Sequence, residues 1–192
     1  MSAASDESVM QAVRDGHIEQ LGVLFDRYHA RIHALCSRLT RQSDAADDLA
    51  QETFLRVLRY RDSYRGESKF STWLYRLACN LCHDHFARGQ RDRATGGLHL
   101  VENAADTRAV ERDERHELLE HAMARLPMDR REVLVLTRYH DLAYDDVARV
   151  LECTPAAARV RAHRALNELR EIYRELEGRQ HDLRTGTRRD RR

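Results

Sequence analysis

Helical periodicity constrains the fold of this chain more than any other feature. Apolar residues recur every three to four positions along most of its 192 residues, as on one face of an α-helix. Two prolines and eight glycines leave room for long uninterrupted helices. The periodicity disappears between Gly89 and Asp113, where Gly96 and Gly97 adjoin and acidic residues replace arginine. We therefore expect an all-α protein of two small helical domains joined by a flexible linker.

The composition shifts divide the chain into four segments. A front helical domain is expected over residues 1–88, the linker over 89–113, a back domain over 114–178 and a basic tail over 179–192. In the front domain the pattern predicts helices from Asp6 to Leu39, broken at Asp15 and Gly16, then from Asp44 as N-cap to about Arg59, and from Thr72 to Arg88.

The back domain has the spacing of a helix-turn-helix preceded by packing helices. Helices are expected over 114–125, 130–139, 144–151 and 155–176. Thr154 before Pro155 is a strong start signal, because its hydroxyl can cap the helix while proline occupies a first-turn position that needs no N–H. A compact module of this kind can enter a DNA major groove.

Total charge identifies no partner. The chain has 33 basic and 32 acidic residues, and Lys69 is its only lysine. The abundance of arginine suits phosphate and guanine contacts, but a GC-rich genome would explain it equally well. No apolar run is long enough for membrane insertion and the first ten residues do not resemble a signal peptide, so we expect a cytoplasmic protein with reduced cysteines.

The last predicted helix carries a candidate DNA-reading face. Its arginines can contact phosphates or guanine edges, and its small apolar side chains can meet thymine methyls. The alternative is an ordinary solvated helix in a bundle. The residues of this face are Ala157, Arg159, Val160, Arg161, His163 and Arg164.

A second face lies on the helix that follows Asp44. Its apolar residues fall on one side, and the opposite side combines acids, an amide and one leucine. These outward residues are Asp48, Gln51, Glu52 and Leu55.

Both ends of the chain resemble the extracytoplasmic-function (ECF) group of the sigma-70 family. The stretches DAADDLAQETFLRVLRY and FSTWLYRLACNLCHDHFAR resemble the family's region 2, and LPMDRREVLVLTRYHDLAYDDVARVLECTPAAARVRAHRAL is similar to region 4. The two motifs occur in the family's order and separation. The resemblance implies a two-domain sigma factor that binds core RNA polymerase and promoter DNA, aids promoter opening and catalyses no reaction.

The resemblance also implies roles for particular residues. Asp48, Gln51, Glu52 and Leu55 would dock on polymerase, although without it Asp48 and Glu52 are better explained as solvating a helix beside Arg56. The back helix would read the −35 element, but alanine or valine at positions 143, 156, 157 and 160 departs from the family pattern. An anti-sigma factor is a further possible partner.

A loop and the helix after it would read the −10 element and hold the melted strand, because aromatic rings can stack on unpaired bases. Taken individually, Phe70 and Trp73 are better explained as core residues than as base platforms, and Arg65, Lys69 and Arg76 could simply be solvated. The candidates are Tyr64, Arg65, Lys69, Phe70, Ser71, Thr72, Trp73, Arg76, Asn80, Asp84 and Arg88.

Other functional classes find less support. Cys79, Cys82 and His83 could share a helix face, but a second ligand pair at zinc-site spacing is missing, so no metal or cofactor is expected. A Cys/His hydrolase or nuclease would need a nucleophile with an orienting base. A helix-turn-helix regulator that is not a polymerase subunit is the main alternative, and it would have no use for the docking helix or the melting loop.

Overall fold

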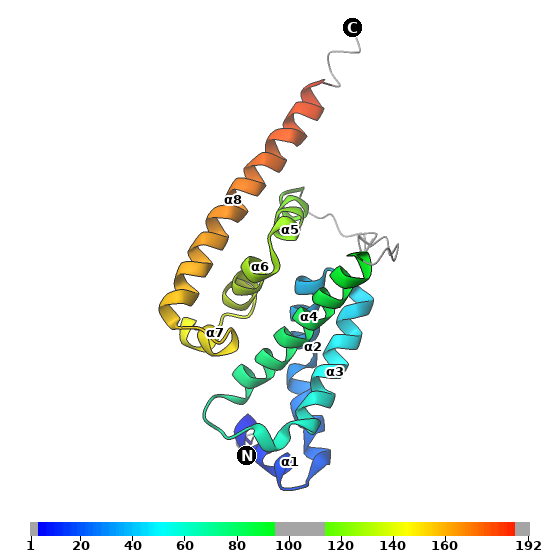
Figure 1. Ribbon diagram of the computed structural model, residues 1–192, viewed down its shortest axis with the longest axis vertical. Helices are drawn as coiled ribbons and strands as arrows, with labels where there is room; N and C mark the ends of the chain where they lie inside the picture. The colour runs from blue at the N-terminus through cyan, green and yellow to red at the C-terminus, as the bar shows by residue number, and fades with distance from the viewer. Residues whose placement is uncertain (1–3, 95–113, 187–192) are drawn as a thin grey trace.

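The protein is all-α, as expected. A computed structural model describes residues 4–94 and 114–186, and this part of the chain contains no strand. The α-helices, shown in Figure 1, are α1 (Asp6–Arg14), α2 (Leu21–Thr40), α3 (Ser43–Arg59), α4 (Phe70–Ala94), α5 (Glu114–Arg125), α6 (Met128–Leu134), α7 (Tyr144–Val150) and α8 (Pro155–Gly186). Short turns η1 (Ile18–Gln20), η2 (Arg61–Ser63) and η3 (Val135–Tyr139) connect them.

The front half is a bundle of α2, α3 and α4, with α1 packed across one end (Figure 1). The predicted break after Asp15 is present, and Gly16 supplies a positive φ of 104° there. The predicted cap at Asp44 is wrong. Helix α3 begins at Ser43 after Gln42, which makes no side-chain cap, and Asp44 instead places its carboxylate in the first turn, where the helix dipole favours negative charge.

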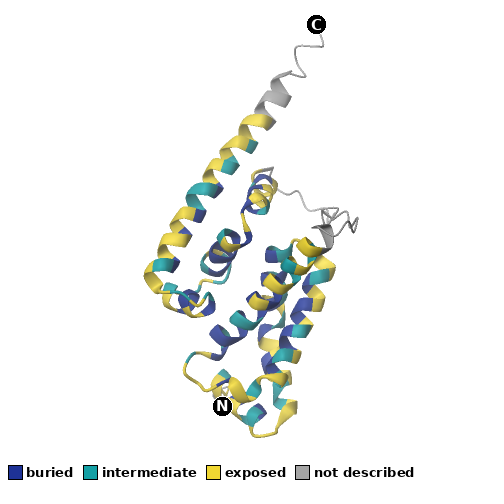
Figure 2. Ribbon diagram, in the orientation of Figure 1, coloured by how far each residue is buried: buried dark blue, intermediate teal, exposed yellow. Residues whose placement is uncertain are grey.

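The back half places α5, α6 and α7 against α8. The predicted cap at Thr154 is confirmed, because its Oγ1 accepts a hydrogen bond from Ala157 N at 3.2 Å. The helix expected over 130–139 starts earlier, at Met128, and its second half is a π-helical turn. Helix α8 extends beyond the expected end of the domain to Gly186. Between 170 and 179 exposed residues predominate along it (Figure 2), although Ile172, Tyr173 and Leu176 still pack against the core.

The two halves pack against each other. Helix α4 lies on α7, and α2 contacts α6. The guanidinium of the buried Arg131 donates to Leu39 O of α2 at 2.7 Å, and to Met123, Ala124 and Leu126 O around the end of α5 at 2.9–3.1 Å. Burial, and secondarily the charge of Arg41, lower the pKa of Arg131 to about 10. One cation thus satisfies carbonyls at the ends of two helices from different halves.

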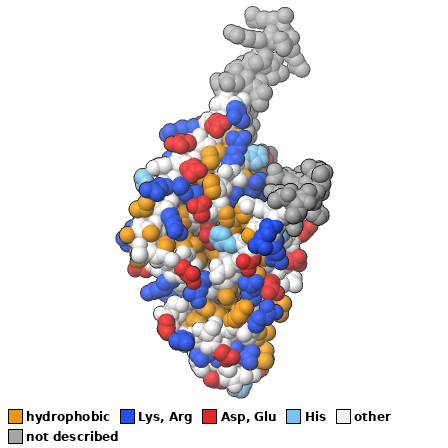
Figure 3. Space-filling view, in the orientation of Figure 1, with side chains coloured by type: hydrophobic (Ala, Val, Ile, Leu, Met, Phe, Trp, Pro, Cys, Tyr) orange, Lys and Arg blue, Asp and Glu red, His pale blue; other side chains and the backbone are white. Residues whose placement is uncertain are grey.

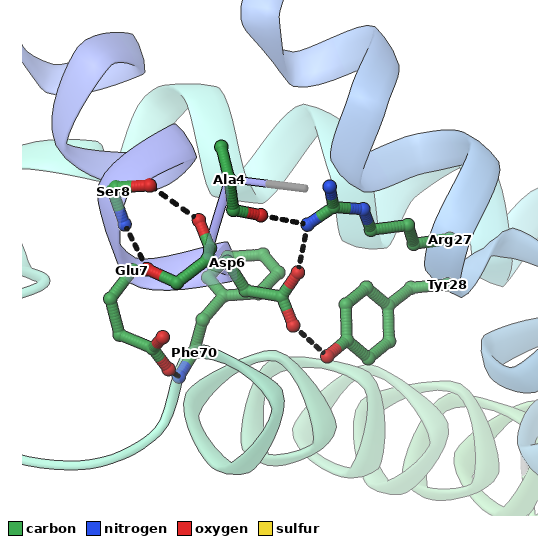
Figure 4. Close-up of polar contacts among 8 residues, drawn as sticks. Ala4, Asp6, Glu7, Ser8, Arg27, Tyr28 and Phe70 are labelled. Carbon is green, nitrogen blue, oxygen red and sulfur yellow. Dashed lines mark hydrogen bonds and ion pairs between the residues drawn. The ribbon is translucent and has the colours of Figure 1, made fainter. Parts of the chain in front are cut away.

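Helix α1 fixes the start of α4. Glu7 Oε1 accepts a hydrogen bond from Phe70 N at 3.2 Å, so a side chain 63 positions earlier in the chain caps α4 (Figure 4). Asp6 receives hydrogen bonds from Arg27 Nη1 at 2.6 Å and from Tyr28 Oη, which tie α1 to α2. Burial first, and Asp6 second, raise the pKa of Tyr28. The end of the bundle that carries the Tyr64–Phe70 loop is therefore held by three helices.

Candidate protein and nucleic-acid interfaces

The outward face of α3 is arranged as its periodicity predicts. Ala50, Phe54 and Val57 are buried, and Leu55 on the opposite side has 55% of its surface exposed. Around Leu55, Asp48 and Gln51 are exposed and Glu52 is half-buried. Leu55 is the most exposed of the large hydrophobic side chains in the described part of the chain, and acidic and amide groups surround it.

Ion pairs hold part of this face in place. Glu52 Oε1 lies 3.5 Å from Arg56 Nε and 3.9 Å from Arg59 Nη1. These are exposed or half-exposed pairs of the kind that contribute little stability. The local pairing with Arg56 that the sequence suggested is therefore present, and it leaves Leu55 uncovered.

The aromatic residues of the candidate −10 region form a core. Tyr64, Phe70 and Trp73 are buried, with ring centroids 5.3–6.2 Å apart, and Tyr28 of α2 packs edge-on against Phe70 at 5.6 Å. Phe70 and Trp73 are therefore core residues, which is the alternative given for them from the sequence. In this conformation their rings support the loop, since none of the three offers a free face to a base.

Polar groups surround this aromatic core. Arg65 and Lys69 are exposed, while Ser71 and Arg76 are half-buried. A cavity of about 610 Å³ lies between the loop and α7, with Tyr64, Arg65, Thr72, Trp73 and Arg76 on one side and Arg149 on the other. Asp62 and Glu67 also line the cavity, which thus combines aromatic edges with both cations and carboxylates.

Asp146 of α7 closes one side of this region. Its Oδ2 lies 3.0 Å from Lys69 Nζ, and its Oδ1 accepts a hydrogen bond from Thr72 Oγ1 at 3.2 Å. Arg149 Nη1 lies 3.3 Å from the same Oδ1. Burial alone would raise the pKa of Asp146, but the hydrogen bond and charge of Lys69, together with Thr72 and Arg149, lower it below its usual value. Thr72 is buried as a result of this packing.

Farther along α4 the expected outer positions are exposed. Asn80, Asp84 and Arg88 face solvent. Asp84 Oδ2 lies 3.5 Å from Arg56 Nη2 of α3, and Arg88 Nε donates to Asp84 O at 3.3 Å. These side chains follow one another on a single face at helical spacing.

The candidate reading face of α8 is open. Its inward residues Ala158, Ala162, Ala165 and Leu169 are buried against the other helices of the back half. The outward residues Arg159, Val160, Arg161, His163 and Arg164 are exposed, and Ala157 is half-buried. Over the face of the molecule shown in Figure 3, basic and acidic side chains intermingle, so no single patch of positive charge dominates that view.

The departures at positions 143 and 157 have different structural consequences. Ala143 is the N-cap of α7 and provides no side-chain cap, so the turn lacks the bond that a hydroxyl could make. At Ala157, by contrast, the backbone N–H is satisfied by Thr154. Small residues at the start of α8 leave its first turns accessible to a backbone as bulky as DNA.

The cysteines are free, and three of them are buried. Hydrogen bonding with Cys36 first, and burial second, raise the pKa of Cys82, while burial raises that of Cys79. His83 is half-exposed and points instead to Glu132 of α6, with Nε2 to Oε2 at 3.0 Å. Within the described ranges no three His, Cys, Asp or Glu side chains are placed to hold a metal ion together.

Sequence reasoning did not single out the residues that join the halves, which are Arg131, Glu132, His140 and Asp146. It also missed Glu7, which caps α4. Tyr75 Oη and His140 Nδ1 are hydrogen-bonded at 3.1 Å, beside the pair of His83 and Glu132. One signal was available, because Glu132 and Asp146 are acids at positions where the helical period calls for inward residues. Their partners could not be read from local spacing.

Comparison with known proteins agrees with this geometry. Residues 24–92 match the family model for sigma-70 region 2, and residues 116–169 match that for sigma-70 region 4. The chain is 30% identical over 177 residues to the RNA polymerase sigma-H factor of Pseudomonas aeruginosa, covering 86% of this chain and 92% of that protein. It is 32% identical over 170 residues to the sigma factor CarQ of Myxococcus xanthus, covering 88% and 97% of the two chains.

Solved structures support the same fold. The sigma factor RpoE of Bartonella quintana, in complex with the anti-sigma factor NepR, gives a TM-score of 0.69 at 22% identity, over 80% of this chain and 96% of that one. CnrH in complex with the cytosolic domain of CnrY gives 0.66 at 20% identity, over 88% and 97%. None of the described helices is long and apolar enough to cross a membrane. With both regions matched in order, and relatives aligned along nearly their whole length, the chain belongs to the ECF group of the sigma-70 family of RNA polymerase sigma factors.

Proposed function

We propose that this sigma factor docks on core RNA polymerase through α3, reads the −10 element with the loop and outer face of α4, and reads the −35 element with α8. The domains would be residues 1–88 for polymerase binding and −10 recognition and 114–178 for −35 recognition, joined by 89–113 and followed by the tail 179–192. In this role the protein catalyses no reaction itself and acts in the cytoplasm, where polymerase meets the promoter.

The exposed Leu55 is the observation that best supports the docking assignment. An apolar side chain 55% exposed on a helix whose other side is well packed can be buried by a partner at little cost to the fold. The acids at 48 and 52 suit a basic partner surface and would guide its approach. The proposed occupant is a helical segment of the largest polymerase subunit.

The open face of α8 supports the −35 assignment. Arg159, Arg161 and Arg164 extend from the outer side of the helix, and the small Ala156 and Ala157 near them let its first turn approach a groove closely. Val160, 49% exposed, is placed to contact a thymine methyl. His163 lies on the same surface.

The −10 assignment divides its residues by burial. The buried rings of Tyr64, Phe70 and Trp73 would fix the shape of the loop. The contacts to the strand would come from the polar groups around these rings and from the outer face of α4. The exposed or half-buried groups are Arg65, Lys69, Ser71, Arg76, Asn80, Asp84 and Arg88. Thr72 also belongs to this set, but it is buried against Asp146 in this conformation.

The main alternative is a helix-turn-helix regulator that binds DNA without being a polymerase subunit. It is disfavoured because region 2, with its docking face, is matched as fully as region 4. The related RpoE and CnrH were both solved with regulatory partners, so we also propose an anti-sigma factor as a possible partner here.

Co-elution with bacterial core RNA polymerase tests the proposal most directly. The wild-type chain is expected to co-elute and to start transcription from the DNA upstream of its own gene. Glu52→Arg should abolish co-elution while the helical circular dichroism spectrum stays unchanged. Asp26→Arg is the matched control, since it makes the same charge reversal at an exposed position of α2. Normal polymerase binding by Glu52→Arg contradicts the docking assignment, and DNA binding without any polymerase binding favours the regulator.

A further inference from the structure

Two arginines of α2 lie near η3 without an acidic partner. Arg31 and Arg38 are about two turns apart on one side of α2, the helix that contacts η3. In the described ranges neither guanidinium has a carboxylate oxygen within 4.0 Å. By contrast Arg27, one turn earlier on the same helix, is paired with Asp6. The charge of Arg31 and Arg38 is therefore available to an anion.

A histidine with an unsatisfied nitrogen lies beside these arginines. His140 directly follows η3, and its Nδ1 forms a hydrogen bond with Tyr75 Oη of α4 at 3.1 Å. Its other ring nitrogen, Nε2, is buried and has no hydrogen-bond partner, and the same holds for Arg38 Nε. Buried polar groups in folded proteins are rarely unpaired, because the lost hydration is then not replaced. Each of these two nitrogens can accommodate an acceptor from outside the chain.

An aromatic ring orients one of the two guanidinium groups. Arg38 Cζ lies 4.2 Å from the centroid of the Tyr139 ring, which is a cation–π contact. The N–H groups of arginine lie in the plane of the guanidinium, so stacking on its face does not use them. Arg31 is exposed and forms the solvent side of the cluster.

From this arrangement we propose that Arg31, Arg38 and His140 bind a pyrophosphate group, such as the phosphoryl end of a nucleoside di- or triphosphate. Seven residues of helix separate the Cα atoms of the two arginines by about 10 Å, so the pair suits an anion longer than a single phosphate. Each guanidinium would hold one phosphoryl unit, and His140 Nε2–H would donate to an oxygen between them. The site is separate from the surfaces assigned to polymerase and promoter DNA and goes beyond the proposed function.

The charges around His140 suit a bound anion. Burial first, then Arg38 and Arg31, lower the pKa of His140 to about 4, while the neighbouring Asp141 acts more weakly in the opposite sense. Burial raises the pKa of Tyr75, so its hydroxyl keeps its proton and can donate to Nδ1. In that arrangement the neutral imidazole carries its hydrogen on Nε2. A bound anion offsets both arginines and should raise the pKa of His140.

Isothermal titration calorimetry of the full-length chain with inorganic pyrophosphate tests the site. We expect saturable binding of one ligand per chain. Arg31→Gln and Arg38→Gln should each weaken it by about tenfold, as loss of a charge-assisted hydrogen bond does. Arg174→Gln removes the same charge at an exposed position of α8 and should leave the affinity unchanged. The absence of saturable binding, or an equal loss in all three variants, overturns the proposal.

A second pair of variants isolates the histidine nitrogen. His140→Phe keeps an aromatic ring but removes Nε2, and it should weaken pyrophosphate binding by about tenfold. Tyr75→Phe breaks the same hydrogen bond to His140 but keeps Nε2, and it should bind like the wild type. Circular dichroism verifies that both variants are folded. Equal losses in the two variants would assign the effect to packing and overturn the role of His140.

Nuclear magnetic resonance provides a readout that packing alone does not move. The imidazole signal missing from the His140→Phe spectrum identifies His140, and its pKa should rise from about 4 when pyrophosphate saturates the protein. An unchanged pKa shows that the anion binds elsewhere and refutes the site.

The source of the pyrophosphate group is separated by competition. Adenosine diphosphate that binds more tightly than pyrophosphate assigns the site to a nucleotide, and equal affinities assign it to the free pyrophosphate group. Sulfate has only one unit and should bind about tenfold more weakly than either. If sulfate competes equally, or a single-stranded oligonucleotide displaces pyrophosphate more effectively than the nucleotide does, the cluster is not a pyrophosphate site.

Discussion

The two surfaces assigned to promoter DNA are built in opposite ways. On α8 the reading residues project from a rigid helix anchored by alanines, and nothing in the described chain covers them. On α4 the polar groups lie above buried aromatic rings, and an acid from α7 contacts the first of them. Reading a closed duplex requires only exposed groups on a rigid support. Holding an unpaired strand requires a shaped loop, which can also be covered.

The largest expected effect comes from Arg131, on which the shape of the back half depends. Arg131→Met should lower the free energy of unfolding by about 3 kcal/mol, because four carbonyl oxygens lose a charged donor while the methionine fills only part of the space. Urea denaturation followed by circular dichroism measures the change. The neighbouring Arg130→Met, which breaks only partly exposed ion pairs with Glu168 and Asp129, should cost less than about 1 kcal/mol. Equal losses in the two variants would show that the buried guanidinium of Arg131 contributes no more to the free energy of unfolding than the partly exposed one of Arg130.

The open surface of α8 predicts a smaller and purely functional effect. Arg164→Ala should weaken binding to promoter duplex by about 1–3 kcal/mol, with polymerase affinity unchanged, since its side chain is exposed and supports no other residue. Fluorescence anisotropy with the DNA upstream of the protein's own gene measures the loss. Arg170→Ala, also exposed but nearly two turns farther along α8, is the control. If both variants bind like the wild type, α8 does not read that DNA.

The shaped surface of α4 predicts an effect on its support. Glu7→Ala removes the acceptor of Phe70 N and should destabilise the front half by about 1 kcal/mol, as loss of a helix cap does. Thermal unfolding measures it, and Glu19→Ala, an exposed acid in η1, should be nearly silent. Because Glu7 caps the helix that carries the −10 candidates, the same variant should also weaken the −10 contacts, although Glu7 is not itself one of the proposed DNA-contacting residues. An intact thermal transition in Glu7→Ala would show that α4 needs no cap from α1.

Local pattern explains how much of this could be predicted. The helices, the inward and outward faces of α3 and α8, and the cap at Thr154 all depend on residues within a few positions of each other, and each was predictable. The cap of α4 and the contact of Lys69 with Asp146 depend on pairs separated by 63 and 77 positions. Sequence periodicity predicts that Asp146 points inward, but it does not predict that Lys69 is its partner. The prediction of a cap at Asp44 failed for a local reason. Helix α3 begins one residue earlier, at Ser43, and leaves the Asp44 carboxylate inside the first turn.

At pH 6 the smallest expected effect is the pH dependence of the contact between the halves, where two histidines act with opposite sign. The hydrogen bond to Glu132 raises the pKa of His83 above 6.5, so its contribution is complete below that pH and is lost as pH rises through the raised value. Burial first, then Arg38 and Arg31, lower the pKa of His140 to about 4. Its contribution is therefore complete above 6.5 and falls as the pH drops toward 4, by at most about 1 kcal/mol at pH 6.

Single variants separate these two slopes. His83→Gln should flatten the loss of stability between pH 6.5 and 8, whereas His140→Gln should flatten the loss between pH 6.5 and 5. Urea midpoints at half-unit steps of pH measure both. Should His83→Gln leave the alkaline slope intact, the pair with Glu132 contributes nothing to the contact between the halves. The hydrogen bonds and ion pairs from Lys69, Thr72 and Arg76 would then join the start of α4 to the back half without it.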